Sequence, residues 1–426
     1  MSATTATGGL VRPMVTTRAP SASTAMAMST RRTPAATGQT ANPSVASKHQ
    51  EPDDDLLTDL FTAYYCARAN KRNTWAQVKF EQHLTDNLMA LYEDIRTRRY
   101  KVGRSICFII RDPVQREIFA ASFRDRIVHH LVYNDLSPVF ERDFINDSYS
   151  CRTGRGTLYG LDRLMTAMSE CSAGFTRDTW VLKLDISGYF MNINRQKLYD
   201  IISSHPALAL CTPVSGRFPS FPALIPSSEI NSACSSISLE RRKILHYLLS
   251  QIIFNDPTKG CRIKGSSSDW HGLPQSKSLF WSPPGCGLPI GNLTSQLFSN
   301  IYLDRLDHFI TEKLGFRFYG RYVDDFYLVD ADKEHLLNAI GKIRTFLREE
   351  LCLTLHPRKV YLQPVCRGVK FLGAVLYPEC RYPSSRTLSR YRYSLVESLP
   401  SEKDLYRRKA VLDSYKGYFS HFSSSV

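Results

Sequence analysis

The sequence predicts a mixed fold of strands and helices, of the α+β or α/β class, and three observations favour it. Short apolar runs of strand character alternate along the chain with stretches whose apolar residues recur at helical spacing. Hydrophobic residues make up 43% of the 426 residues, which is enough for a sizeable core. The alternation begins only after Pro52, where the composition of the chain changes.

The first fifty residues are dominated by Ser, Thr, Ala, Gly and Pro and contain no Asp or Glu. Such a segment buries too little apolar surface to offset its chain entropy, so we expect residues 1–52 to form a disordered tail. A less favoured alternative for an acid-poor, Arg- and Ser-containing start is an organelle transit peptide.

The first half of the globular part predicts helices and strands in alternation. A stripe of leucines and isoleucine predicts a helix over 84–95, and 116–123 (REIFAASF) has strand character. Asp125 can cap a helix that ends before Ser137-Pro138. The run 180–186 (WVLKLDI) predicts a buried strand, and Asn194 can cap the helix that follows.

The second half continues the alternation after an interruption. Residues 203–285 begin with a Pro- and Ser-rich stretch and end in a Gly- and Ser-rich one, which indicates an insertion around a helix at 239–254. Helical spacing then predicts helices over 293–314 and 336–351. Between them, 316–329 (FRFYGRYVDDFYLV) predicts two strands joined at the paired acids.

Charge and cysteine content narrow the class of protein. The 55 Lys and Arg against 40 Asp and Glu give a net charge of +15, which favours a polyanionic partner such as nucleic acid. The 11 cysteines form no C-x-x-C pair, which indicates reduced thiols in a cytosolic compartment rather than a disulfide scaffold or zinc ribbon. We find no apolar run of ~18 residues and expect no membrane span.

Three aspartates lie where carboxylates are usually unfavourable. Asp185 ends an apolar strand, and Asp324 and Asp325 are neighbours at a turn between strands. Adjacent carboxylates repel each other unless a cation neutralises them, and hard oxygen ligands suit Mg²⁺. Two such ions ~3.5–4 Å apart can activate a 3′-hydroxyl and stabilise a leaving pyrophosphate.

The segments around these aspartates resemble reverse transcriptases. YVDD at 322–325 resembles their catalytic hairpin, and LKLDISGYFMNI at 182–193 resembles their first metal-binding strand. The flanking blocks at 148–157 (SYSCRTGRGT) and 356–376 are similar in order and spacing. The resemblance implies a right-hand polymerase with fingers and palm over 53–376, a helical thumb over 377–426, and RNA-directed DNA synthesis.

One block resembles the reverse transcriptases of diversity-generating retroelements. In GLPIGNLTSQLFSNIYLDRLDHF at 287–309, Ile290 stands where most reverse transcriptases have Gln, and Ser295-Gln296 replaces their Ser-Pro. The block at 116–133 (REIFAASFRDRIVHHLVY) is similar to the same family. The resemblance implies frequent errors opposite template adenine and mutagenic retrohoming. The alternatives are a retron, group II intron or phage-defence reverse transcriptase, or a non-catalytic RNA-binding scaffold.

The resemblance also implies roles for individual residues. Asp185 and Asp324 would be the principal ligands of two Mg²⁺ ions, which Mn²⁺ can replace, with the Ile186 carbonyl and Asp325 as further ligands. Phe190 would be a steric gate that excludes a ribose 2′-hydroxyl; the alternative is a core aromatic.

Further positions would contact the substrates. Ile290 and Gly291 would line the nucleotide pocket, and an alkyl side chain in place of an amide is a physical source of low fidelity. Arg116 and Arg124 would bind the triphosphate or form surface ion pairs, and Lys359 would approach the leaving pyrophosphate. The residues expected at the template and primer are Ser295, Gln296, Arg390, Arg392, Arg407 and Arg408.

The expected partners are a template RNA, a primer or cDNA, dNTPs and a small basic helical accessory protein, in the cytoplasm of a bacterium. The C-terminal segment interleaves Arg and Lys with aromatic residues, which suits phosphate pairing and base stacking; an ordinary basic helix with buried aromatics is the alternative.

Overall fold

The computed structural model describes residues 54–69, 73–111, 114–210, 237–396 and 402–422. The described residues belong to one compact unit of mixed helix and sheet, which confirms the predicted fold class at that level. The predicted disordered tail, residues 1–52, lies outside the described residues. All cysteines that the structure describes carry free thiols.

The central sheet has four antiparallel strands in the order β5-β6-β3-β7. They are β5 (Phe318–Tyr322), β6 (Asp325–Asp330), β3 (Trp180–Ile186) and β7 (Leu355–Pro364). The strand predicted over 180–186 and the predicted hairpin around the paired acids are both confirmed. The strand β3 contacts apolar clusters on both of its faces, with Leu182, Leu184 and Ile186 in one cluster and Val181 in the other. This burial on both sides explains its nearly continuous apolar sequence.

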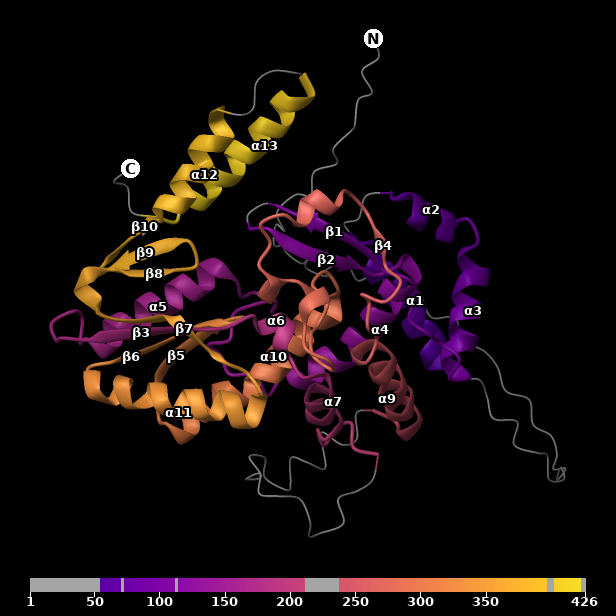
Figure 1. The fold of residues 1–426 in the computed structure, drawn as a ribbon, viewed down its shortest axis with the longest axis horizontal. Helices are drawn as coiled ribbons and strands as arrows, with labels where there is room; N and C mark the ends of the chain where they lie inside the picture. The colour runs from indigo at the N-terminus through magenta and orange to yellow at the C-terminus, as the bar shows by residue number, and fades with distance from the viewer. Residues whose placement is uncertain (1–53, 70–72, 112–113, 211–236, 397–401, 423–426) are drawn as a thin grey trace, which may run out of the picture. The chain divides into compact units, whose positions relative to one another are not determined.

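Helices cover both faces of this sheet (Figure 1). On one side α5 (Thr157–Cys171) packs against β5 and β6. On the other side α11 (Lys333–Leu351) contacts β6 and α10 (Leu293–His308). The helix predicted over 293–314 changes character at Phe309, where a π-helical turn (Phe309–Lys313) follows α10.

A helical group adjoins α10 and continues the same apolar core. Its helices are α1 (Asp54–Arg68), α2 (Trp75–Glu81), α3 (Leu84–Arg96), α4 (Phe123–Phe140), α7 (Arg195–Ser203) and α9 (Leu239–Ile253). The side chain of Asn194 accepts from the Lys197 amide, as the predicted cap of α7. Among the described helices, none combines the length and apolar character that crossing a bilayer requires.

The predicted boundaries around α4 were wrong. The strand expected over 116–123 ends at Ala120, and the N-cap is Ser122 rather than Asp125. Ser122 Oγ accepts from the Asp125 amide and donates to the Asp125 carboxylate. The Ser122 side chain thereby gives a hydrogen-bond partner to a backbone amide in the first turn, and the Asp125 carboxylate orients the Ser122 hydroxyl. The helix also continues through Pro138 to Phe140, because buried Leu136 and Phe140 pack into the core on either side of the proline.

A second sheet has the strand order β2-β1-β4. β1 (Ile106–Ile110) and β2 (Arg116–Ala120) are antiparallel, and β4 (Arg262–Ile263) pairs in parallel with β1. The chain then forms three 3₁₀ turns: η1 (Ser267–Trp270), η2 (Gln275–Lys277) and η3 (Leu279–Trp281). The later part of the predicted insertion is therefore attached to this sheet through β4. Residues 211–236 of the predicted insertion lie outside the described residues.

The C-terminal part follows η5 (Val365–Arg367). It has a small antiparallel sheet and two helices. The strands are β8 (Val369–Phe371), β9 (Ala374–Tyr377) and β10 (Cys380–Pro383), and the helices are α12 (Ser385–Val396) and α13 (Glu402–Phe419). The two helices contact each other through the rings of Tyr391, Tyr415 and Phe419. These three aromatic residues thus bind the helices together, as the alternative interpretation of the segment expects.

Candidate active site

Three aspartates meet at one end of the central sheet. Asp185 lies directly opposite Asp325 in the register of β3 and β6, and Asp324 precedes β6 in the hairpin turn. The Ile186 amide donates to the Asp324 carbonyl at 3.2 Å, which fixes the turn against the end of β3. The register thereby brings together all three carboxylates that the sequence predicted.

Burial and mutual repulsion act on these carboxylates. Burial, together with the charges of Asp185 and Asp325, raises the pKa of Asp324 to about 6. Burial also raises the pKa of Asp325, and the Lys183 ammonium opposes that rise. The group therefore lies in a site where added positive charge is favourable.

Two lysines supply part of that positive charge. Lys359 Nζ, from β7, lies 2.8 Å from Asp185 Oδ2, and Lys183 Nζ, from β3, lies 3.4 Å from Asp325 Oδ1. Within the described part of the chain, no Lys or Arg forms an ion pair with Asp324. Lys359, predicted from its sequence block, therefore lies in direct contact with a candidate metal ligand.

The chemistry of this donor set fits a divalent cation. The carboxylates of Asp185 on β3, Asp325 on β6 and Asp324 in the adjoining turn offer the oxygen ligands that Mg²⁺ prefers, and a cation would offset the burial and repulsion that raise the pKa of Asp324. In the described residues, no group of three or more His, Cys, Asp or Glu side chains is already arranged around a metal position. The carboxylates of Asp185 and Asp325 instead each face a lysine.

The predicted nucleotide-pocket residues also come together. Phe190, in the short helix α6 (Tyr189–Asn192), and Ile290 both pack against one apolar cluster. The cluster consists of Cys107, Phe119, Met191 and Leu279. Backbone bonds link the same segments, from the Leu288 amide to the Phe190 carbonyl at 2.8 Å and from the Phe119 amide to the Ile290 carbonyl at 2.9 Å. Phe190 and Ile290, which are 100 positions apart in sequence, thus contact the same apolar cluster and form one wall with it.

Gly291 is a glycine for a steric reason. Its φ of +119° is strained for other residues, and a Cβ there would lie 2.8 Å from Ile118 Cγ2. The chain after Ile290 consequently passes directly against β2, which leaves no space for a side chain at 291.

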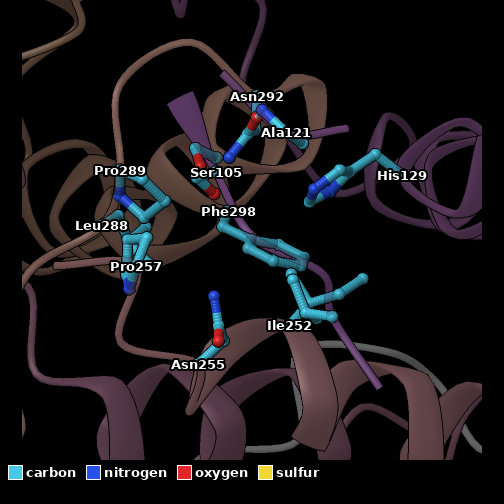
Figure 2. A pocket seen from close by; sticks show the side chains of 12 residues that line it. Ser105, Ala121, His129, Ile252, Asn255, Pro257, Leu288, Pro289, Asn292 and Phe298 are labelled. Atoms are coloured by element: carbon cyan, nitrogen blue, oxygen red, sulfur yellow. Dashed lines mark hydrogen bonds between the residues drawn. The ribbon is translucent and has the colours of Figure 1, made fainter. Parts of the chain in front are cut away.

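Ser295 and Gln296 lie in the first turn of α10, away from an open surface. Ser295 is buried and Gln296 is half-buried. Ser295 lines a cavity of about 20 Å³. Figure 2 shows His129, Asn292 and Phe298, which line the same cavity. That volume has room for about one water molecule, so the Ser295 side chain is packed in the interior of the described structure.

The two predicted triphosphate arginines lie in different surroundings. Arg116, exposed on β2, is close enough to the hairpin that its charge opposes the rise in the pKa of Tyr322 that burial causes. Arg124 instead donates to Asp94 at 2.7 Å and lies over the Tyr100 ring at 4.8 Å from the ring centre. Arg124 thus forms an ion pair with Asp94 of α3, and an ion pair is the alternative to triphosphate binding at this position.

The predicted thumb arginines are on α12 and α13. Arg392 is exposed and Arg390 is half-buried on α12. Arg407 and Arg408 fall within α13, but their side chains lie outside the described residues.

Three charged residues of the site were missed by the sequence reasoning. Lys183 contacts Asp325, and Arg321 forms a fully buried ion pair with Asp307 beneath the hairpin. A signal was present, because Lys183 is the one cation in the strand 180–186 and Arg321 the one cation in the strand 318–322, and each has mostly apolar neighbours. A cation within a buried strand indicates a nearby carboxylate.

No family model matches the chain. Protein YkfC of Escherichia coli (strain K12) is 23% identical over 369 residues, which cover 78% of this chain and 79% of that protein.

Telomerases are among the similar solved structures. Apo telomerase from Candida tropicalis gives a TM-score of 0.42 at 11% identity, covering 78% of this chain and 67% of that one. Telomerase from Candida albicans in complex with a fragment of telomeric RNA gives 0.40 at 13% identity, covering 81% and 59%. A C-terminally truncated C. tropicalis form gives 0.40 at 14% identity, and the chain spans 60% of its length.

Proposed function

We propose that this chain is an RNA-directed DNA polymerase that joins nucleotides by two-metal nucleotidyl transfer. The observation that carries the proposal is the register that sets Asp185 opposite Asp325, with Asp324 in the adjoining turn. This register places Asp185 beside the two aspartates of the YVDD hairpin. The three carboxylates are the metal ligands that a two-metal reaction requires.

The surrounding residues have roles consistent with this chemistry. Asp185, Asp324 and Asp325 would hold two Mg²⁺ ions, which would supply activation of the attacking hydroxyl and stabilisation of the leaving group. Lys359 would exchange its contact with Asp185 for the pyrophosphate once a cation is bound. Phe190 would exclude a 2′-hydroxyl from the pocket that it forms with Ile290.

We further propose that the enzyme is of the diversity-generating retroelement type, with errors concentrated at template adenines for mutagenic retrohoming. The support is Ile290, whose side chain packs against the apolar cluster and offers no hydrogen bond to a nucleotide or template. A template RNA, a primer or cDNA, dNTPs and a small basic helical accessory protein would be its partners.

A primer-extension assay tests the polymerase. The purified full chain is supplied with an RNA template, a DNA primer, dNTPs, Mg²⁺ and the accessory protein encoded nearby. We expect extension that is abolished in Asp324→Ala and retained in Glu350→Gln, a control that changes an exposed carboxylate at the end of α11. RNA binding without extension would instead support a non-catalytic scaffold.

A further inference from the structure

The hairpin that carries Asp324 and Asp325 rests on a buried ion pair. Arg321, in β5, and Asp307, near the end of α10, are both fully buried. Arg321 Nη2 lies 2.6 Å from Asp307 Oδ2, and Nε lies 2.7 Å from Oδ1. This two-bond geometry fixes the plane of the guanidinium.

One of the remaining donors of Arg321 reaches the turn itself. Nη1 donates to the Val323 carbonyl at 3.1 Å, and Nη2 donates to Ser148 Oγ at 3.2 Å. The Val323 carbonyl belongs to the peptide group that joins Val323 to Asp324. The guanidinium therefore fixes the orientation of the backbone immediately before the candidate metal ligand.

That stretch of backbone is unfavourable without support. Val323 has a φ of +57°, in the left-handed region that β-branched residues rarely adopt. Such a conformation persists only where surrounding contacts hold it. The bond from Arg321 is a contact of this kind.

Stability alone does not explain an ion pair in this position. A buried pair gains little net stability, because desolvation of both charges offsets their attraction. Asp307 also accepts from Tyr319 at 2.5 Å, so its carboxylate is held from two neighbouring residues of β5. The pair is better explained by the accuracy with which it places the turn.

We propose that Arg321 is a positioning residue that sets the metal affinity of the aspartate cluster by holding the Val323–Asp324 peptide, with Asp307 as its counter-ion. The inference rests on the proposed function, since the metal in question is that of the polymerase site. It assigns Arg321 no contact with the substrate.

The test measures metal binding separately from catalysis. Electron paramagnetic resonance follows Mn²⁺ binding to the full chain, primer extension gives the half-saturating Mg²⁺ concentration, and thermal unfolding reports on folding. The variants are Arg321→Lys and, as a matched control, Arg241→Lys. Arg241 is another largely buried arginine with carboxylate partners, Asp59 and Asp135, on α1 and α4.

We expect Arg321→Lys to raise the Mn²⁺ dissociation constant and the half-saturating Mg²⁺ concentration about tenfold, because an ammonium cannot make the forked contacts. Arg241→Lys should lower the unfolding temperature without changing either metal constant. Adding Val323→Gly to Arg321→Lys should recover part of the affinity, because glycine adopts φ +57° without strain.

Other outcomes overturn the inference. Equal Mn²⁺ affinity in folded Arg321→Lys and wild type would do so, as would equal losses in the two lysine variants. If Arg321→Lys does not fold, Ser148→Ala removes one neutral partner of the guanidinium and should raise the Mn²⁺ constant about twofold; no change would again refute the role.

The proposed function fails in a distinguishable way. Mn²⁺ binding that disappears in Asp324→Asn, without primer extension by the wild type, would reject the polymerase and still decide the role of Arg321. An absence of Asp324-dependent Mn²⁺ binding would reject both.

Discussion

At the scale of single residues, Asp324 shows how a functional side chain can lower the stability of the fold that contains it. Its pKa is raised to about 6 by burial and by Asp185 and Asp325, above the value of 3.8 for an ordinary aspartate. The folded chain therefore binds this proton more tightly than the unfolded chain does. Ionised Asp324 opposes folding above pH ~6, and this cost disappears as the pH falls toward the unfolded value.

This linkage predicts a stabilising substitution. In EDTA at pH 7.5, Asp324→Asn should raise the unfolding temperature by about 2 °C, because it removes a buried charge from a repulsive cluster. At pH 4.5 the gain should be much smaller, because Asp324 is then mostly protonated in the folded wild type, and it should vanish only below the unfolded pKa of 3.8. Thermal unfolding followed by circular dichroism measures both, with Glu350→Gln as an exposed control. A gain that is the same at both pH values would contradict the assignment.

Ile290 gives a prediction about fidelity. If the apolar side chain at this position causes misincorporation, Ile290→Gln should lower errors opposite template adenine about tenfold by restoring hydrogen-bonding groups. Sequencing of cDNA made in vitro measures the error rate at each template base. Ile290→Val, which keeps the wall apolar, should leave the errors in place; an unchanged rate in Ile290→Gln would refute the link.

At the scale of elements, the sequence predicted what is encoded locally. The strand over 180–186 and the hairpin at Asp324 were predictable because apolar runs and a turn mark them directly. The register that sets Asp185 opposite Asp325 could only be inferred from the resemblance, since pairing depends on residues far apart in sequence. The end of α4 was missed because core packing around Pro138 outweighs the local rule.

The segment from β4 to η3 was also missed, because its attachment depends on residues far away in the sequence, with Glu117 prominent among them. The buried Glu117 carboxylate accepts from Trp270 Nε1 at 2.6 Å, Ser278 Oγ at 2.9 Å and the Leu279 amide at 2.7 Å. Nothing local in a Gly- and Ser-rich stretch indicates these bonds. They place Leu279 against Phe119 and thus complete the wall behind Ile290.

Removing this carboxylate should release the segment. Glu117→Ala leaves three donors without their acceptor, at a cost of about 1–3 kcal/mol for each donor that stays buried. Amide hydrogen exchange in peptides covering 267–282 should therefore become at least tenfold faster, while β3 and β6 keep their protection. Arg111→Ala, which removes only the exposed pair with Asp269, should change little. Unchanged exchange in Glu117→Ala would show that other contacts hold the segment.

At the scale of the whole molecule, the positive charge is not confined to one end. Of the net +15, residues 1–50 account for +5, which leaves +10 on the rest of the chain. Composition alone could predict a polyanionic partner but not where it binds. On α12, the Tyr391 ring packs against Tyr415 and Phe419 of α13, whereas the Arg392 side chain is exposed. Of these two α12 residues, Arg392 is therefore the one that can reach a polyanionic partner.

This arrangement predicts that α12 binds nucleic acid through phosphates rather than through stacked bases at Tyr391. Arg392→Glu should weaken binding of an RNA–DNA duplex several-fold and lower the slope of log affinity against log salt by about 1. Arg344→Glu makes the same charge reversal at an exposed position of α11. It should leave the affinity and the salt slope near their wild-type values. Fluorescence anisotropy over 50–200 mM salt measures them. Equal effects of the two reversals would mean that net charge, and not the α12 surface, determines binding.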